Sequence, residues 1–106
     1  MQVHSKKLLV IIAEAALEKN LVKDARAHGA QGWTIVDARG GGAGGAREAI
    51  WEADRTIEMK VICDEGVAGR LAQHILETYA AHYALTLFVS DVGVFRPEKF
   101  ASRRGD

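Results

Sequence analysis

The amino-acid sequence predicts a two-layer α+β fold in a single domain that spans residues 1–106, with the element order β-α-β-β-α-β. Three observations predict this fold. The chain has 106 residues, which is the length of one domain. Apolar residues make up 48% of the chain and charged residues 26%, a composition typical of a globular protein. Apolar runs with the period of strands alternate with runs that have the period of helices.

The first half of the chain predicts a strand, a helix and a second strand. Residues 7–13 predict a strand: after Lys7 they form a continuous apolar run, which is typical of a strand buried on both faces. Residues 14–28 carry apolar side chains at helical spacing with charged side chains between them, which predicts an amphipathic helix. Gly29 follows at the position where a glycine commonly ends a helix. The β-branched and aromatic run over 32–37 predicts the second strand.

A glycine-rich segment separates the two halves. Five of the six residues 40–45 are glycine, which disfavours regular structure because glycine loses the most conformational freedom on folding. We therefore expect a long mobile loop over residues 39–54.

The second half repeats the order of strand and helix. Residues 55–64 alternate between apolar and polar and predict a third strand. An apolar residue every four positions predicts a helix over 67–83. Residues 85–95 predict the fourth strand, and a change of apolar phase near Ser90-Asp91 predicts a β-bulge in it. Residues 97–106 form a polar C-terminal tail.

This order is that of the ferredoxin-like sandwich, in which both helices cover the same face of the sheet. The other face is polar in a typical monomer. Here the first strand is apolar on both sides, and Ile62 and Phe88 fall on the face away from the helices. Lys plus Arg and Asp plus Glu both number 14, so no net charge keeps copies apart. Because an exposed apolar face usually marks an interface, we expect a homo-oligomer.

Composition and spacing also exclude several classes of protein. Zero net charge argues against a mainly electrostatic nucleic-acid binder. The single cysteine, Cys63, excludes an intramolecular disulfide and is interpreted as a small buried hydrophobe. The histidines lack metal-ligand spacing, so we expect no metal site, and we expect surface positions for His74 and His82. The first apolar run is only six residues long and ends at Glu14, too short for a signal peptide, which indicates a cytoplasmic protein.

The glycine cluster is the most informative feature for function. Arg39 and Arg47 flank it, and glycine N–H groups together with guanidinium groups bind phosphate. The cluster lacks the Gly-Lys-Ser/Thr of a P-loop, so a simple flexible linker is the other interpretation. Ile50 and Trp51 lie further along the same loop. They either pack back onto the domain as an anchor or form a binding hot spot for a partner protein.

The residues Gly29-Ala30-Gln31-Gly32-Trp33-Thr34-Ile35-Val36 resemble the Gly-hydrophobe-Thr signature of PII signalling proteins. A loop rich in glycine and arginine follows, as the T-loop does in that family. The chain is similar to the PII-like branch associated with carboxysomes and bicarbonate transporters, whose loop also runs glycine-rich and then has an arginine where Arg47 stands. The resemblance implies a homotrimer with the sheets facing inward and adenine nucleotides bound between subunits.

The resemblance also implies which residues bind the nucleotide. They are Gly32, Trp33 and Thr34 from one subunit, Lys60 and Ile62 near the adenine and ribose, Gly40, Gly41 and Gly42 at the base of the loop, Arg47 at the phosphate, and Leu85, Thr86, Leu87 and Phe88 beside the cleft. Nitrogen-regulatory PII proteins bind polyphosphate with a Gly-Asp-Gly-Lys stretch, where this chain has Tyr83-Ala84-Leu85-Thr86. This departure favours ADP or AMP, with cyclic AMP and ATP as further ligands to test.

The function expected from this reasoning is a non-enzymatic regulatory sensor without a prosthetic group. It would bind ADP or AMP, with bicarbonate as a second ligand, and control a bicarbonate transporter or a carboxysome component. The alternative is a small phosphate-ester or anhydride hydrolase on the same fold. That activity needs a well-placed asparagine, and the single one, Asn20, lies on the first helix away from the loop. An RNA-binding sheet would need an aromatic pair on the open face, where Phe88 stands alone.

Overall fold

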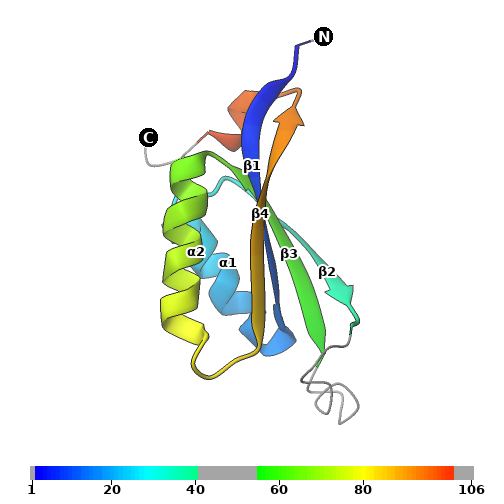
Figure 1. The fold of residues 1–106 in the computed structure, drawn as a ribbon, viewed down its shortest axis with the longest axis vertical. Coiled ribbons are helices and arrows are strands. Elements are labelled where there is room, and N and C mark those ends of the chain that lie inside the picture. Colours follow the sequence, from blue (N-terminus) through cyan, green and yellow to red (C-terminus); the bar gives the residue numbers. More distant parts are fainter. Residues whose placement is uncertain (1, 41–54, 102–106) are drawn as a thin grey trace.

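The computed structural model describes residues 2–40 and 55–101, and they form the predicted ferredoxin-like fold (Figure 1). The described elements are β1 (His4–Glu14), α1 (Glu18–Ala27), β2 (Thr34–Ala38), β3 (Thr56–Cys63), α2 (Glu65–Tyr79) and β4 (Leu85–Val94), with short 3-10 helices at Ala15–Leu17 and Pro97–Phe100. The strands form one antiparallel sheet in the order β2-β3-β1-β4. Strands β2 and β4 are therefore the two edges of this sheet.

The position of β1 in the sheet explains its continuous apolar run. It pairs with β3 on one side and with β4 on the other. Leu9 and Ile11 face the helices, and Val10, on the opposite face, is still only 2% exposed. The two neighbouring strands therefore bury Val10 even on the face that the helices do not cover, which accounts for an apolar residue at this position.

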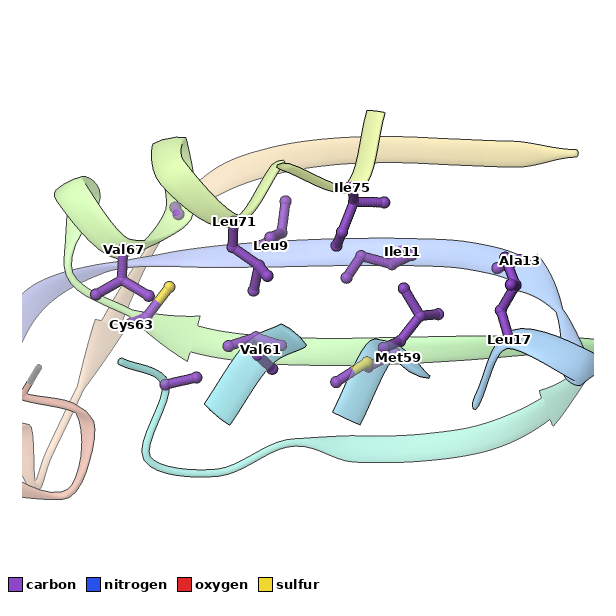
Figure 2. Packing of buried hydrophobic residues seen from close by; sticks show 14 of the residues in the cluster. Leu9, Ile11, Ala13, Leu17, Met59, Val61, Cys63, Val67, Leu71 and Ile75 are labelled. Atoms are coloured by element: carbon purple, nitrogen blue, oxygen red, sulfur yellow. The ribbon is translucent and has the colours of Figure 1, made fainter. Parts of the chain in front are cut away.

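The core lies between the sheet and the two helices, which cover the same face (Figure 1). Leu71 and Ile75 of α2 point toward Leu9 and Ile11 of β1, as Figure 2 shows. Cys63 is 1% exposed and belongs to this cluster, so its prediction as a small buried hydrophobe is confirmed. Deep burial of these side chains is the main source of stability for a domain of this size.

Gly29 ends α1 as predicted. Its φ is 102°, in the region that residues with a side chain rarely adopt. The Ala30 amide donates to the Ala25 carbonyl with an N–O distance of 3.0 Å, and the Gly29 amide to the Arg26 carbonyl at 3.2 Å. These bonds satisfy carbonyls that the end of the helix leaves without partners.

The first helix begins later than predicted because β1 continues through Glu14. The backbone of Glu14 is extended, with φ −65° and ψ 139°, and it pairs with Thr56 of β3. The next amide, that of Ala15, donates to the Arg55 carbonyl at 2.7 Å. Pairing with β3 therefore overrides the helical spacing of the sequence, and α1 begins only at Glu18.

The last strand contains no β-bulge, contrary to the prediction. Its register with β1 runs without interruption from Leu85 opposite Ala13 to Val94 opposite His4. Asp91 interrupts the apolar phase because it forms an ion pair with Lys7, which lies directly opposite it. On an edge strand such a charged pair replaces apolar contact without an added residue.

The second helix is shifted toward the N-terminus compared with the prediction and ends at Tyr79. The His82 and Tyr83 amides both donate to the Tyr79 carbonyl, at 3.1 and 3.0 Å, and form a turn. Tyr83 continues the four-residue apolar repeat but is 39% exposed and lies edge-to-face with Tyr79.

In the described part of the chain no helix combines the length and the apolar character needed to cross a membrane.

Candidate functional site

Three residues that were assigned to the ligand site lie in one row across the sheet. Thr34 of β2 pairs with Lys60 of β3, Lys60 pairs with Val10 of β1, and Val10 pairs with Phe88 of β4. Directly opposite residues share a face, and this row is on the face away from the helices. The predicted open-face positions of Phe88 and Ile62 are confirmed, since Ile62 pairs with Leu8 in the adjacent row.

The open face combines apolar and polar side chains. Phe88 and Val36 are 49% and 42% exposed, so apolar surface reaches both edges of the sheet. Lys60 supplies a positive charge in the centre of this face, and its Nζ lies 3.5 Å from a carboxylate oxygen of Glu58. A face with a cation amid apolar surface suits a ligand that has both an aromatic ring and an anionic group.

Other predicted residues face the helix layer instead. Leu85, Leu87 and Trp33 pack against the core, so a ligand on the open face can reach only their backbone. The Arg26 guanidinium lies 5.1 Å from the centre of a Trp33 ring, a cation–π distance. Thr86 lies opposite Ile12 and shares the open face with Phe88.

Gly32 lies just before β2, and a Cβ at this position would meet nothing within 4 Å. Packing within one chain therefore does not explain a glycine there. Gly40 follows the end of β2, two residues after Ala38, which pairs with Thr56. Several predicted site residues lie outside the described part of the chain: Gly41, Gly42, Arg47, Ile50 and Trp51.

The predicted residues are divided between the two edges of the sheet. Thr34 is on edge strand β2 and Phe88 on edge strand β4, with β3 and β1 between them. At about 4.8 Å per strand spacing, the two backbones are about 14 Å apart. A single chain therefore does not bring these two parts of the predicted site together.

A polar cluster between α1 and α2 was not among the predicted site residues. Asp24 accepts a hydrogen bond from the Tyr79 hydroxyl at 2.5 Å, and His74 Nε2 lies 3.1 Å from its other carboxylate oxygen. The rings of His28 and His74 are 4.6 Å apart. Burial, followed by the bond to Asp24, raises the pKa of Tyr79 to about 12. The members come from positions about fifty residues apart, so no local spacing could have predicted the cluster. Among the described residues no group of side chains could hold a metal ion.

Two further surface features lie along β4. A shallow groove of about 350 Å³ separates α2 from β4, and small or apolar residues line most of it: Ala68, Gly69, Ala72, Leu76, Leu87 and Val89. In the first half of β1, Lys6 pairs with Asp64 at 2.5 Å and Lys7 pairs with Asp91. The hydrogen bond and charge of Asp91 raise the pKa of Lys7. These two lysines are less exposed than Lys60 and lie closer to their carboxylates than the 3.5 Å between Lys60 and Glu58, so they are poorer candidates than Lys60 for binding an anion.

Comparison with known proteins identifies the family. The family model for nitrogen regulatory protein P-II matches residues 6–99, nearly the whole chain. The chain belongs to the P-II family. Proteins of this family bind adenine nucleotides and are generally regulators without enzymatic activity, so this is a PII-like signalling protein. A search of curated proteins gives no match.

Solved PII-like structures share this fold over nearly their full length. A PII-like signalling protein from Thermus thermophilus is 42% identical, with a TM-score of 0.81, and the match covers 94% of this chain and 99% of that one. The CPII protein from Thiomonas intermedia, bound to ADP, AMP and bicarbonate, is 28% identical, with a TM-score of 0.82 and coverage of 95% and 98%. CPII bound to ADP and bicarbonate is also 28% identical, with a TM-score of 0.81 and coverage of 93% and 97%.

Proposed function

We propose that this PII-like protein is a sensor that binds ADP or AMP, together with bicarbonate, and regulates a partner in inorganic-carbon uptake. The observation that carries the proposal is the row Thr34–Lys60–Phe88 on the open face in a chain that is 28% identical to CPII bound to ADP, AMP and bicarbonate. Lys60 would attract the anionic ligand, and the adjacent apolar surface would receive the adenine ring.

The division of the site between two edges supports binding between subunits. In a closed ring of identical copies, the β2 edge of one chain can lie beside the β4 edge of the next, because such contacts are head-to-tail. This arrangement would unite Thr34 of one copy with Phe88 of its neighbour. It would also cover the apolar open face, so we propose a homotrimer whose nucleotide sites lie between subunits.

The regulated partner follows from the proposed second ligand. A protein whose nucleotide affinity depends on bicarbonate reports inorganic carbon and adenine nucleotides together, because coupling between two sites is reciprocal. A bicarbonate transporter or a carboxysome component is therefore the proposed partner. Ile50 and Trp51 are the residues that we propose contact it.

Calorimetric titration tests the proposal. AMP, ADP, ATP, cyclic AMP and adenosine are titrated with and without bicarbonate. We expect micromolar binding of ADP or AMP at one site per subunit, and an affinity that changes when bicarbonate is present. The absence of binding by every nucleotide, at any bicarbonate concentration, would contradict the proposed function.

Substitution of Arg47 tests the phosphate role. Arg47→Ala should weaken ADP binding more than adenosine binding, because only ADP carries the phosphates that a guanidinium group recognises. Arg96→Ala is the control: it removes the same charge from a side chain that is 70% exposed and paired only with the nearby Glu98 in the described part. Equal losses for ADP and adenosine in Arg47→Ala would exclude Arg47 as a phosphate ligand.

A further inference from the structure

The end of β1 makes a contact that the predicted site residues do not explain. Glu14, the last residue of β1, accepts a hydrogen bond at Oε2 from the backbone N–H of Ala84, with an N–O distance of 2.9 Å. Ala84 immediately precedes β4, and one further step of the β1–β4 register places it opposite Glu14. A side-chain carboxylate therefore binds the backbone just beyond the last residue pair of the β1–β4 register.

The other side of Glu14 is fixed to β3. Its backbone pairs with Thr56, the first residue of β3, and Thr56 pairs in turn with Ala38, the last residue of β2. The Ala15 amide adds a bond of 2.7 Å to the Arg55 carbonyl. Glu14 thus links the start of β4 to the place in the sheet where β2 ends and β3 begins.

The connection between α2 and β4 depends on this contact at its far end. The turn bonds from His82 and Tyr83 to the Tyr79 carbonyl fix the side nearer α2. Glu14 holds the side nearer β4, where Leu85 and Thr86 begin the strand. A hydrogen bond that involves a charged group is stronger than a neutral one, so this carboxylate is suited to hold a surface connection in place.

We propose that Glu14 is a positioning residue for the ligand site. Its carboxylate sets where the backbone of Leu85 and Thr86 lies relative to the base of β2 and β3, and so sets the geometry that a nucleotide meets. This inference rests on the proposed function above. Because the contact is at the surface and outside the core, its loss should change ligand affinity more than global stability.

Three variants test the inference. Glu14→Ala removes the acceptor, Glu14→Gln keeps an acceptor oxygen without the charge, and Glu77→Ala removes an exposed carboxylate on α2 that accepts a bond from Gln73 at 3.0 Å. Amide hydrogen exchange over residues 80–85 is measured without ligand, and ADP affinity and thermal unfolding are measured for each variant.

We expect Glu14→Ala to speed exchange at Ala84 by about fivefold or more, since this amide then opens locally. ADP affinity should fall about three- to tenfold, the range that corresponds to the net loss of one typical hydrogen bond. Glu14→Gln should lose less affinity than Glu14→Ala, because an acceptor oxygen remains although the charge that strengthens the bond is gone. Glu77→Ala should change neither property, and all variants should unfold at nearly the wild-type temperature.

The outcomes separate this inference from the proposed function. If the wild type binds no adenine nucleotide, the proposed function fails, and the positioning role fails with it. If the wild type binds ADP and Glu14→Ala binds it equally well, only the positioning role is overturned. Unchanged exchange at Ala84 in Glu14→Ala would also overturn it. An affinity loss in Glu14→Gln as large as that in Glu14→Ala would overturn the role of the acceptor oxygen, because charge alone would then explain the effect.

Discussion

Cys63 illustrates how burial changes the chemistry of a single residue. Its thiol lies in the core beside Val67 (Figure 2), and desolvation, with a smaller effect from the charge of Asp64, raises its pKa from 9.0 to about 11. The thiolate is the reactive form of cysteine, so the folded protein keeps this group unreactive at neutral pH.

The raised pKa of Cys63 predicts a loss of stability in alkali. In the unfolded chain the thiol ionises near pH 9, whereas in the folded protein it stays protonated until about pH 11. The unfolded state therefore gains charge first, and the free energy of unfolding falls as the pH rises through this window. Cys63→Val should reduce this fall by an amount on the order of 2 kcal/mol, the equivalent of the pKa shift.

Urea unfolding at fixed protein concentration, at intervals from pH 8 to 11, measures the effect of Cys63. The difference between wild type and Cys63→Val isolates the thiol from Tyr79, whose raised pKa acts in both proteins. Parallel curves for the two proteins between pH 9 and 11 would show that Cys63 does not carry this dependence.

At the scale of elements, two glycines have opposite roles in the two helices. Gly29 has a positive φ at the end of α1, whereas Gly69 lies inside α2, where a Cβ would meet nothing within 4 Å. The first glycine is required by its backbone conformation. The second weakens its helix, because glycine is a poor helix former.

Replacing each glycine with alanine should therefore change stability in opposite directions. Gly29→Ala should lower the free energy of unfolding by about 1–2 kcal/mol, the cost of forcing a side chain into a left-handed conformation. Gly69→Ala should raise it by about 0.5–1 kcal/mol through helix propensity. Chemical denaturation measures both, and a stabilising Gly29→Ala would contradict the role of Gly29 as the end of α1.

At the scale of the whole molecule, the two faces of the sheet differ in what covers them. The helices α1 and α2 cover one face, and within a single described chain the other face leaves Phe88 and Val36 exposed. The proposed trimer accounts for this surface, because burial of apolar area is the main driving force for association.

A pair of matched variants tests this assembly. Phe88 on the open face and Leu76 on the helix side are each 49% exposed, so lysine at either position adds the same charge at equal exposure. Phe88→Lys should shift a trimer toward monomers, since burying an unpaired ammonium group costs several kcal/mol. Leu76→Lys should leave the mass unchanged.

Sedimentation velocity measures the mass of each of these proteins. A monomeric wild type would contradict the proposed trimer. Dissociation by Leu76→Lys, with Phe88→Lys intact, would place the interface on the helix side instead of on the open face.

Part of the candidate site could be predicted from the sequence. Strand alternation correctly placed Ile62 and Phe88 on the open face, because side chains on a strand change face at every residue. The family resemblance added Leu85 and Leu87, whose side chains instead pack toward the core. Resemblance transfers a position along the chain, but the direction of the side chain depends on the register of the strand.

By itself the sequence determined the order of elements, the apolar faces and the end of α1 at Gly29, because each depends on short-range periodicity and local backbone sterics. Only the tertiary structure decided the continuous β1–β4 register, the contact between Glu14 and Ala84, and the cluster around Asp24. These features join residues fifty or more positions apart, and the packing of whole elements sets their distances. Local patterns determine the secondary structure of each segment, whereas the competition among long-range pairings determines which other segments it contacts.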